Sequence, residues 1–182
     1  STVSPTYARE IQSAAHGCGL DGILRSRHRD LHGILNGIDL DEWNPATDRH
    51  IPAHFSAARM KGKAACKAAL QAEAGLPVDP RIPLFGVVGR LTPQKGLDIL
   101  AHCLEKVLGW DVQVVLLGAG DRAAEHFFGG LSDRRRDRFR AWIGFSEPLA
   151  HRIEAGSDLF IMPSRFEPCG LNQLYSLRYG TL

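Results

Sequence analysis

Short apolar runs alternate with helix-like stretches in the second half of the chain, and this alternation limits the possible folds more than any other feature of the sequence. The runs have the length and composition of buried strands, and they lie at residues 83–89, 112–117, 140–143 and 158–162. A segment with helical spacing of apolar residues follows each run. Strands separated by helices pair in parallel through right-handed crossovers. We therefore predict an α/β fold with a Rossmann-like parallel sheet flanked by helices.

The first half of the chain is less regular. Pro5 suits the first turn of a helix, which we expect to run to about Ala15. The pair Asn36-Gly37 favours positive φ and predicts a tight turn. Residues 53–74 are rich in alanine and lysine and predict one long helix that ends before Gly75-Leu76-Pro77.

Composition and charge exclude several classes of protein. The net charge of +2 is too small to predict a nucleic-acid partner or a membrane surface, and no apolar run approaches the roughly 18 residues of a membrane helix. The four cysteines are far apart and without a C-x-x-C pair, which predicts free thiols in a reducing, cytoplasmic compartment. The chain lacks an initial methionine and stops directly after a predicted helix, so we expect a piece of a longer protein.

The stretch 163–172 (PSRFEPCGLN) places one carboxylate, Glu167, between the end of a predicted strand and the start of a predicted helix. Ligands of open α/β sheets bind at such a position. The helix start offers unpaired N–H groups to an anion. Because Glu167 would compete with that anion, we expect it to face a neutral, hydroxyl-rich part of the ligand.

Arg90 and Lys95 lie on another loop between a predicted strand and a helix. A guanidinium and an ammonium near a helix start suit a diphosphate. Most arginine and lysine side chains are instead solvated on the protein surface. The buried strand before the loop favours the binding role.

The run Gly118-Ala119-Gly120-Asp121 matches the loosest form of the dinucleotide fingerprint and keeps a nicotinamide dehydrogenase open as an alternative. The match is not in the first βαβ unit, and an acidic residue stands where phosphate should bind. We interpret it as a tight turn that lets backbone approach a ligand. Phe145 follows another predicted strand, where it could stack on a base or, equally well, belong to the core.

Three patterns resemble metal or nucleic-acid sites but predict neither. Asp39-Leu40-Asp41 spells D-x-D on a predicted turn. His28 and His32, like His50 and His54, are spaced i, i+4 without a third ligand, so we interpret them as unrelated surface histidines. The arginine run 134–136 alternates with aspartates, as on a solvated helix face.

Six blocks in this order resemble the glycogen/starch synthase family, glycosyltransferases of the two-domain GT-B fold. They lie at residues 3–8 (VSPTYA), 34–39 (ILNGID), 43–45 (WNP), 89–98 (GRLTPQKGLD), 117–121 (LGAGD) and 164–180. The resemblance implies three parts, each with a role. Residues 1–34 would be the tail of the N-terminal acceptor-binding domain, 35–50 the interdomain linker, and 51–182 the nucleotide-sugar-binding domain. The chain would then be the C-terminal half of a GT-B enzyme, incomplete at both ends.

The same resemblance implies an activity. The family's enzymes transfer glucose from ADP-glucose to the non-reducing end of an α-1,4-glucan with retention of configuration, without a metal or other cofactor. The partners would be the nucleotide-sugar donor, the glucan acceptor and the remainder of the same enzyme, in the cytoplasm or, for a plant protein, the plastid. A glucan-binding module without catalysis stays open as a further alternative.

The resemblance also assigns residues. Arg90 and Lys95 would hold the diphosphate and stabilise the departing nucleotide, while Glu167 would stabilise the glucosyl ring. Many related retaining enzymes carry a second glutamate eight positions on, where this chain has Tyr175, so paired carboxylates of the glycosidase type are not expected. The remaining substrate-binding candidates are Asn36 near the donor sugar, Gly89, Gly118, Gly144 and Phe145 around the nucleotide, and the backbone N–H groups of Cys169, Gly170 and Leu171.

Overall fold

The computed structural model describes residues 1–182, which group into two compact units. The smaller unit contains residues 1–38 and 167–171, and the larger contains residues 39–166 and 172–182. The boundary after Ile38 falls inside the predicted linker.

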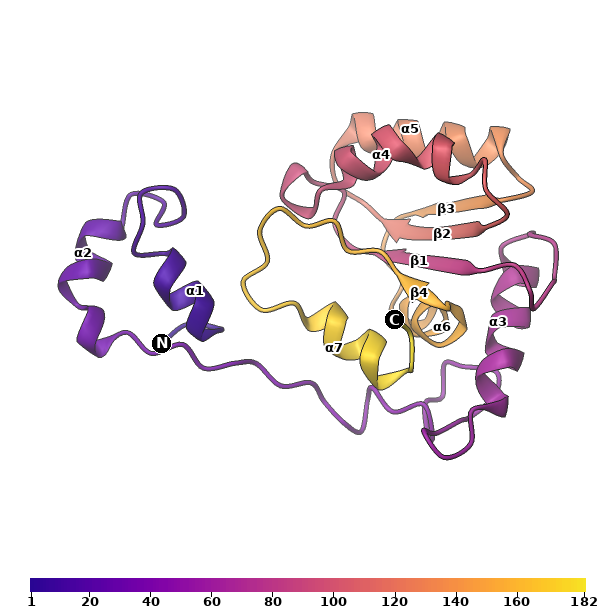
Figure 1. Cartoon of the computed structure of the whole chain (residues 1–182), viewed down its shortest axis with the longest axis horizontal. Helices are drawn as coiled ribbons and strands as arrows, with labels where there is room; N and C mark the ends of the chain where they lie inside the picture. The colour runs from indigo at the N-terminus through magenta and orange to yellow at the C-terminus, as the bar shows by residue number, and fades with distance from the viewer. The chain divides into compact units, whose positions relative to one another are not determined.

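A four-stranded parallel sheet forms the centre of the larger unit (Figure 1). Its order is β3-β2-β1-β4, from Phe139–Ile143, Gln113–Gly118, Leu84–Val88 and Leu159–Phe160. The predicted Rossmann-like parallel sheet flanked by helices is thereby confirmed. The last strand is shorter than predicted, because only its first residues pair with β1 before the chain turns away.

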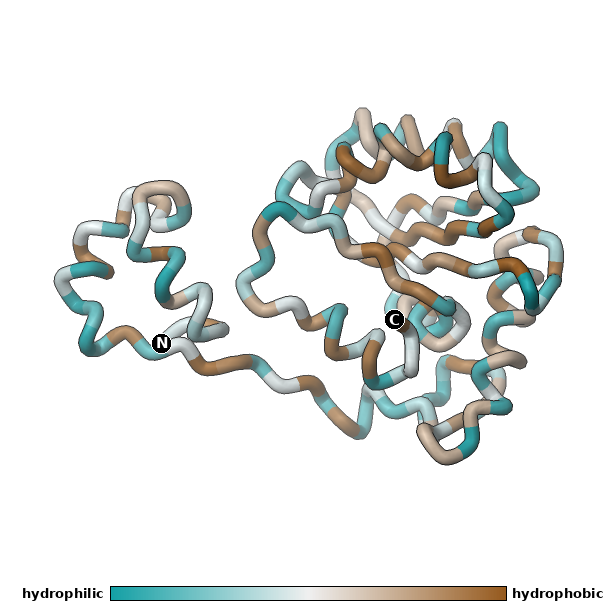
Figure 2. Tube along the Cα trace, in the orientation of Figure 1, coloured by the Kyte–Doolittle hydropathy of each residue, from teal (hydrophilic) through white to brown (hydrophobic).

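Helices cover both faces of this sheet. Helices α4 (Leu97–Val107) and α5 (Arg122–Arg134) lie on one face, and α3 (Lys61–Glu73) and α6 (Glu147–Gly156) on the other (Figure 1). Because strand side chains alternate between faces, Val114 and Leu116 pack toward α4 and α5, while Val115 and Leu117 pack toward α3 and α6. Figure 2 shows β1 and β2 as largely hydrophobic, as expected for strands covered on both sides.

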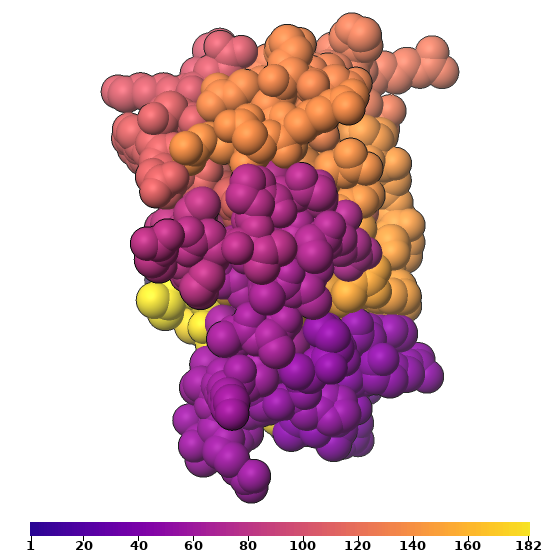
Figure 3. Space-filling model, turned by 90° about the vertical axis from the view of Figure 1, so that its right-hand side faces the viewer, coloured from indigo at the N-terminus to yellow at the C-terminus, as the bar shows by residue number.

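Close contact between α3 and α6 closes the second face, and Figure 3 shows this side of the unit. A Cβ on Gly156 would lie 2.8 Å from Leu70 Cδ2 and 3.0 Å from the Cys66 carbonyl oxygen. Only glycine permits this approach of the two helices. Helix α7 (Leu171–Arg178) is the last element of the chain.

Three local predictions were wrong. The helix predicted from residue 53 begins only at Lys61, because residues 51–60 form turns, with paired backbone bonds between Ser56 and Arg59. The helix from Pro5 ends at Glu10, where the chain enters a series of turns. Asn36-Gly37 forms no turn, since Gly37 has no positive φ and the segment is irregular and exposed.

The smaller unit contains α1 (Pro5–Glu10), α2 (Asp21–Ser26) and a 3-10 helix (His28–Asp30). A parallel bridge pairs Thr2, which precedes these helices, with Gly33, which follows them. Ser4 caps α1 by accepting a hydrogen bond from the Tyr7 N–H. Its hydroxyl also donates to the Pro168 carbonyl oxygen at 2.7 Å. This bond joins residues 167–171 to the start of the chain. None of the helices is long and apolar enough to cross a membrane.

A buried carboxyl group in the larger unit makes folding depend on pH. Glu154 is 2% exposed and accepts a hydrogen bond from Ser176 Oγ at 2.7 Å. Burial raises the pKa of Glu154 to about 8. Lys63, which donates to Thr181 Oγ1 and the Ala155 carbonyl oxygen, has its pKa lowered by burial to about 8.

We predict that the free energy of unfolding decreases as pH rises from about 5 to 8. In this range the folded chain keeps a proton on Glu154 that the unfolded chain releases near its ordinary pKa of about 4.3. The slope contributed by one such group is at most about 1.4 kcal/mol per pH unit. Lys63 contributes the opposite trend, but only above pH 8. Urea unfolding at several pH values should show a flatter profile for Glu154→Gln and an unchanged one for the exposed control Glu105→Gln. Equal slopes in all three proteins would contradict the prediction.

Candidate active site

A pocket of about 350 Å³ lies at the carboxyl edge of the sheet in the larger unit. The ends of three neighbouring strands and the loops that follow them form its wall, with single residues from α6 and α7. The lining residues are Val88, Gly89, Arg90, Leu117, Gly118, Ala119, Gly144, Phe145, Ala150 and Asn172. The structure thus brings together five predicted site residues that are up to 56 positions apart in the sequence (89 to 145).

Phe145 is 91% exposed, although it lies only two residues after the end of β3. A core position for this side chain is therefore excluded. Gly144 before it has a φ of 146°, which side chains rarely adopt and which turns the chain away from β3. The exposed ring at the pocket leaves an aromatic face available to a ligand.

Gly118, the last residue of β2, lets the backbone of this strand approach the start of the loop after β1. A Cβ on Gly118 would lie 2.2 Å from the Gly89 carbonyl oxygen, so any side chain there would push the loops apart. A Cβ on Gly89 meets nothing within 4 Å. Gly118 is therefore required for packing, whereas Gly89 borders open space.

The two predicted cationic residues occupy different positions. Arg90 is exposed in the wall of the pocket. Lys95 ends the 3-10 helix Pro93–Lys95, next to Gly96, whose positive φ of 66° starts α4, and it is not among the residues that line the pocket. Both lie on the loop after β1.

Hydrogen bonds hold the residues on either side of 167–171 to the end of β1 and its loop. Gln94 accepts from the Arg165 N–H at 3.0 Å and donates to the Phe166 carbonyl oxygen at 3.2 Å. Asn172 donates to the Val88 carbonyl oxygen at 2.8 Å. Arg165 also pairs with Asp98, and this contact lowers the pKa of that carboxyl to about 2. The sequence pattern did not predict these hydrogen bonds, although Gln94 and Asn172 both lie within the motif blocks.

The other predicted residues belong to the smaller unit. Glu167 is half-buried, Gly170 has a φ of 80° that admits the turn before α7, and Cys169 and Leu171 flank that turn. Asn36 is exposed in the irregular segment after the 3-10 helix. That these side chains meet the pocket stays a prediction.

Comparison with known proteins identifies the family. The model of the glycosyl transferases group 1 matches residues 82–182, more than half of the chain. The chain belongs to this family. The model of the starch synthase catalytic domain matches residues 1–26.

Individual relatives match the chain over its whole length. It is 62% identical to glycogen synthase of Anaeromyxobacter sp. (strain Fw109-5) and 55% identical to glycogen synthase 1 of Geobacter sulfurreducens, both over 182 residues. It spans 38% and 36% of the length of these two proteins. The catalytic domain of starch synthase IV from Arabidopsis thaliana, bound to ADP and acarbose, matches all of the chain with 38% of its own, at 44% identity and a TM-score of 0.92.

The dehydrogenase alternative finds no support. Asp121 caps α5 by accepting hydrogen bonds from the N–H groups of Ala123 and Ala124, and Glu125 accepts from the Gly120 N–H. In a dinucleotide-binding fold these donors would face a phosphate. In this chain two carboxylates already accept hydrogen bonds from them.

The structure also shows what Asp39 and Tyr175 contact. Asp39 of the D-x-D triplet accepts the N–H groups of Asp41 and Glu42, so its carboxylate closes a turn. Tyr175, which stands at the position of the second glutamate in related enzymes, stacks on Trp43 with ring centroids 3.8 Å apart.

The glycine contact gives a testable difference in stability. We expect Gly118→Ala to lower the free energy of unfolding by about 1–3 kcal/mol, because the new methyl group overlaps the Gly89 carbonyl oxygen. Gly89→Ala is the matched control and should leave stability unchanged or slightly higher. Thermal unfolding of both variants measures the difference, and equal melting temperatures would show that the loops can separate at little cost.

Proposed function

We propose that the chain forms the nucleotide-sugar-binding part of an ADP-glucose-dependent glycogen (starch) synthase. The observation that carries the proposal is the pocket at the carboxyl edge, with Arg90 and the exposed Phe145 in its wall. It is supported by a match of the whole chain to a starch synthase domain bound to ADP. The reaction would add glucose to the non-reducing end of an α-1,4-glucan with retention of configuration.

In this proposal the pocket binds the nucleotide of the donor. The base stacks on Phe145, whose exposed ring would contribute about 1–3 kcal/mol. Gly89, Gly118 and Gly144 let the backbone approach the ligand closely. Arg90 contacts the diphosphate from the wall, and Lys95 adds a second positive charge from the start of α4.

During transfer the bond between the anomeric carbon and the diphosphate oxygen breaks, and its electron pair leaves with ADP. Arg90 and Lys95 stabilise the negative charge that develops on this leaving group. The acceptor hydroxyl forms the new bond to the anomeric carbon, and its proton passes to the departing diphosphate. Glu167 stabilises the ring as it gains positive character, and the N–H groups of Cys169, Gly170 and Leu171 meet phosphate or sugar oxygens. Asn36 lies near the donor sugar, and no metal takes part in the transfer.

The remainder of the enzyme would supply the acceptor site. The chain spans 38% of a curated relative's length, so we propose that a further domain binds the glucan and closes over the donor. The 182-residue segment alone would then bind nucleotide weakly and transfer no glucose. Its four free cysteines fit a reducing, cytoplasmic location.

Charge removal tests the role of the two cations. In a full-length protein carrying this sequence, Arg90→Ala or Lys95→Ala should each lower kcat by about a hundredfold or more, because each removes stabilisation concentrated in the transition state. Arg81→Ala and Lys106→Ala are matched controls, because both side chains are exposed. Arg81 lies just before the amino-terminal end of β1, and Lys106 lies in the last turn of α4. Turnover of the first pair within a few-fold of the controls would refute the diphosphate assignment.

Ligand titration separates the proposed function from its alternatives. Calorimetry of the full-length protein should detect ADP and maltooligosaccharide but not NAD. Phe145→Ala should weaken ADP binding by roughly 5- to 150-fold, the equivalent of the stacking energy, and leave maltooligosaccharide binding intact. Trp110→Ala, which removes another exposed aromatic side chain, serves as the control. Binding of NAD in place of ADP, or of glucan alone, would favour one of the other classes.

A further inference from the structure

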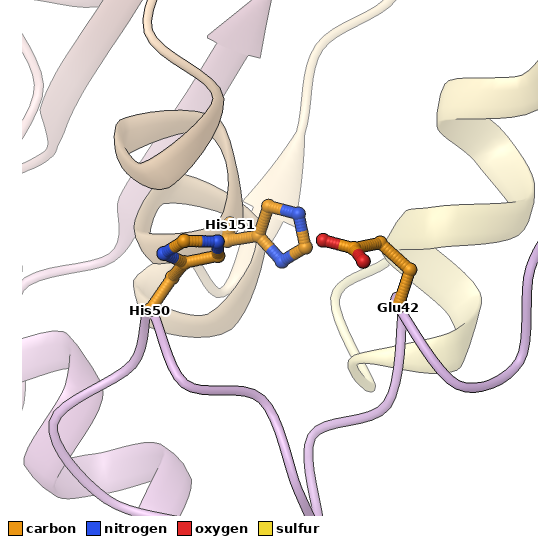
Figure 4. Close-up of side chains that lie close together, drawn as sticks. All are labelled: Glu42, His50 and His151. Carbon is orange, nitrogen blue, oxygen red and sulfur yellow. The ribbon is translucent and has the colours of Figure 1, made fainter.

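Three side chains that the proposed function does not use converge beside α6. His151 projects from α6, and Glu42 and His50 come from the segment between the two units' boundary and α3 (Figure 4). The potential ligand atoms of the three residues all lie within 4.8 Å of one another. None of the three lines the pocket at the carboxyl edge.

His151 has a buried ring nitrogen without a hydrogen-bond partner. Its side chain is fully buried, its Nδ1 lies 2.8 Å from Asp48 Oδ2, and its Nε2 has no hydrogen-bond partner. A buried polar atom without a partner costs free energy and calls for an explanation. The ring nitrogen is therefore available to a ligand.

The contact with Asp48 leaves one ring nitrogen of His151 for a ligand. The Asp48 carboxylate accepts hydrogen bonds from the Tyr179 hydroxyl and the His50 N–H, and its Oδ2 lies 2.8 Å from His151 Nδ1. With Nδ1 facing this carboxylate, Nε2 is the ring nitrogen that remains to bind a metal ion. A carboxylate behind a histidine in this way is the usual outer partner of a metal-bound imidazole.

Neighbouring groups hold the ring in place. Trp43 stacks on His151 with ring centroids 3.8 Å apart and an angle of 12° between the planes. His50 meets the same ring edge-on at 4.9 Å. The orientation of Nε2 is thus fixed before any ligand arrives, which favours binding.

We propose that Glu42, His50 and His151 bind one divalent transition-metal ion, with zinc as the best match to two imidazoles and a carboxylate. Water would complete a tetrahedral site. Bonds of about 2.0–2.1 Å bring ligand atoms to about 3.4 Å from one another, so Glu42 and His50 must close slightly on His151. Both are accessible and sit on a loop, whereas His151 is fixed.

The positively charged side chain of Arg49 lies close to His50 and would weaken the binding of a metal ion there. Arg49 Nε lies 3.4 Å from His50 Nε2, a long contact of an exposed side chain. A metal bound through that nitrogen replaces the contact, and the guanidinium turns to solvent. The bound ion would join residues 42–50 to α6 and stabilise the fold without entering the transfer step.

Metal titration of a full-length protein carrying this sequence, without a histidine tag and stripped by a chelator, tests the proposal. Zinc should bind with one equivalent that is lost in His50→Gln and weakened at least about tenfold in Glu42→Gln. His102→Gln and Glu105→Gln, exposed residues of α4, are the matched controls and should bind as the unaltered protein does. Both test residues are accessible, so these variants keep the buried Asp48–His151 pair.

Two further measurements distinguish this site from surface binding. Cobalt(II) should give the intense visible absorption of four-coordinate cobalt, and His50→Gln should abolish it. Zinc should raise the melting temperature of the unaltered protein but not of His50→Gln. Absence of binding, or equal binding by His50→Gln, would overturn the proposal, and neither result bears on the glycosyltransferase function.

Discussion

Parallel pairing of the four strands is the constraint on which the pocket depends. Because every strand points the same way, the loops after β1, β2 and β3 emerge at one edge, and residues distant in sequence meet there. The register brings Val88 opposite Leu117, and the backbones of Gly89 and Gly118 then come into contact. A larger residue at Gly118 would open the space between the strands' ends, which is why the pocket and the sheet cannot be varied independently.

The packing of the segment before α3 depends on the buried carboxylate of Asp48. It accepts hydrogen bonds from Tyr179, His151 and the His50 N–H, and so joins the segment before α3 to α6 and to the end of α7. Removing it would leave buried donors without a partner, a cost of several kcal/mol in comparable cases. The same carboxylate orients the imidazole of His151, so one interaction both stabilises the fold and prepares the site proposed for a metal.

The loop after β1 lines the pocket and also forms hydrogen bonds with the residues just before Glu167. Gln94, on the loop that carries Arg90 and Lys95, also holds the backbone of Arg165 and Phe166, and Asn172 binds the end of β1. Residues proposed to bind phosphate are thus on the same loop that positions the chain before Glu167. Movement of this loop would therefore disturb both the wall of the pocket and the position of residues 165 and 166.

The sequence by itself determined the alternation of strands and helices, the parallel sheet and the loops that carry Arg90, Lys95 and Glu167, because periodicity and glycine-rich breaks act locally. It could not decide between core and surface for Phe145, and it mispredicted the turn at Asn36-Gly37 and the start of the helix at Lys61. It also interpreted His50 and His54 as unrelated surface histidines, whereas the folded chain brings His50 close to His151, a hundred and one positions away. Tertiary structure decided these points, because burial, hydrogen bonding and convergence of side chains depend on segments that neighbour one another only after folding.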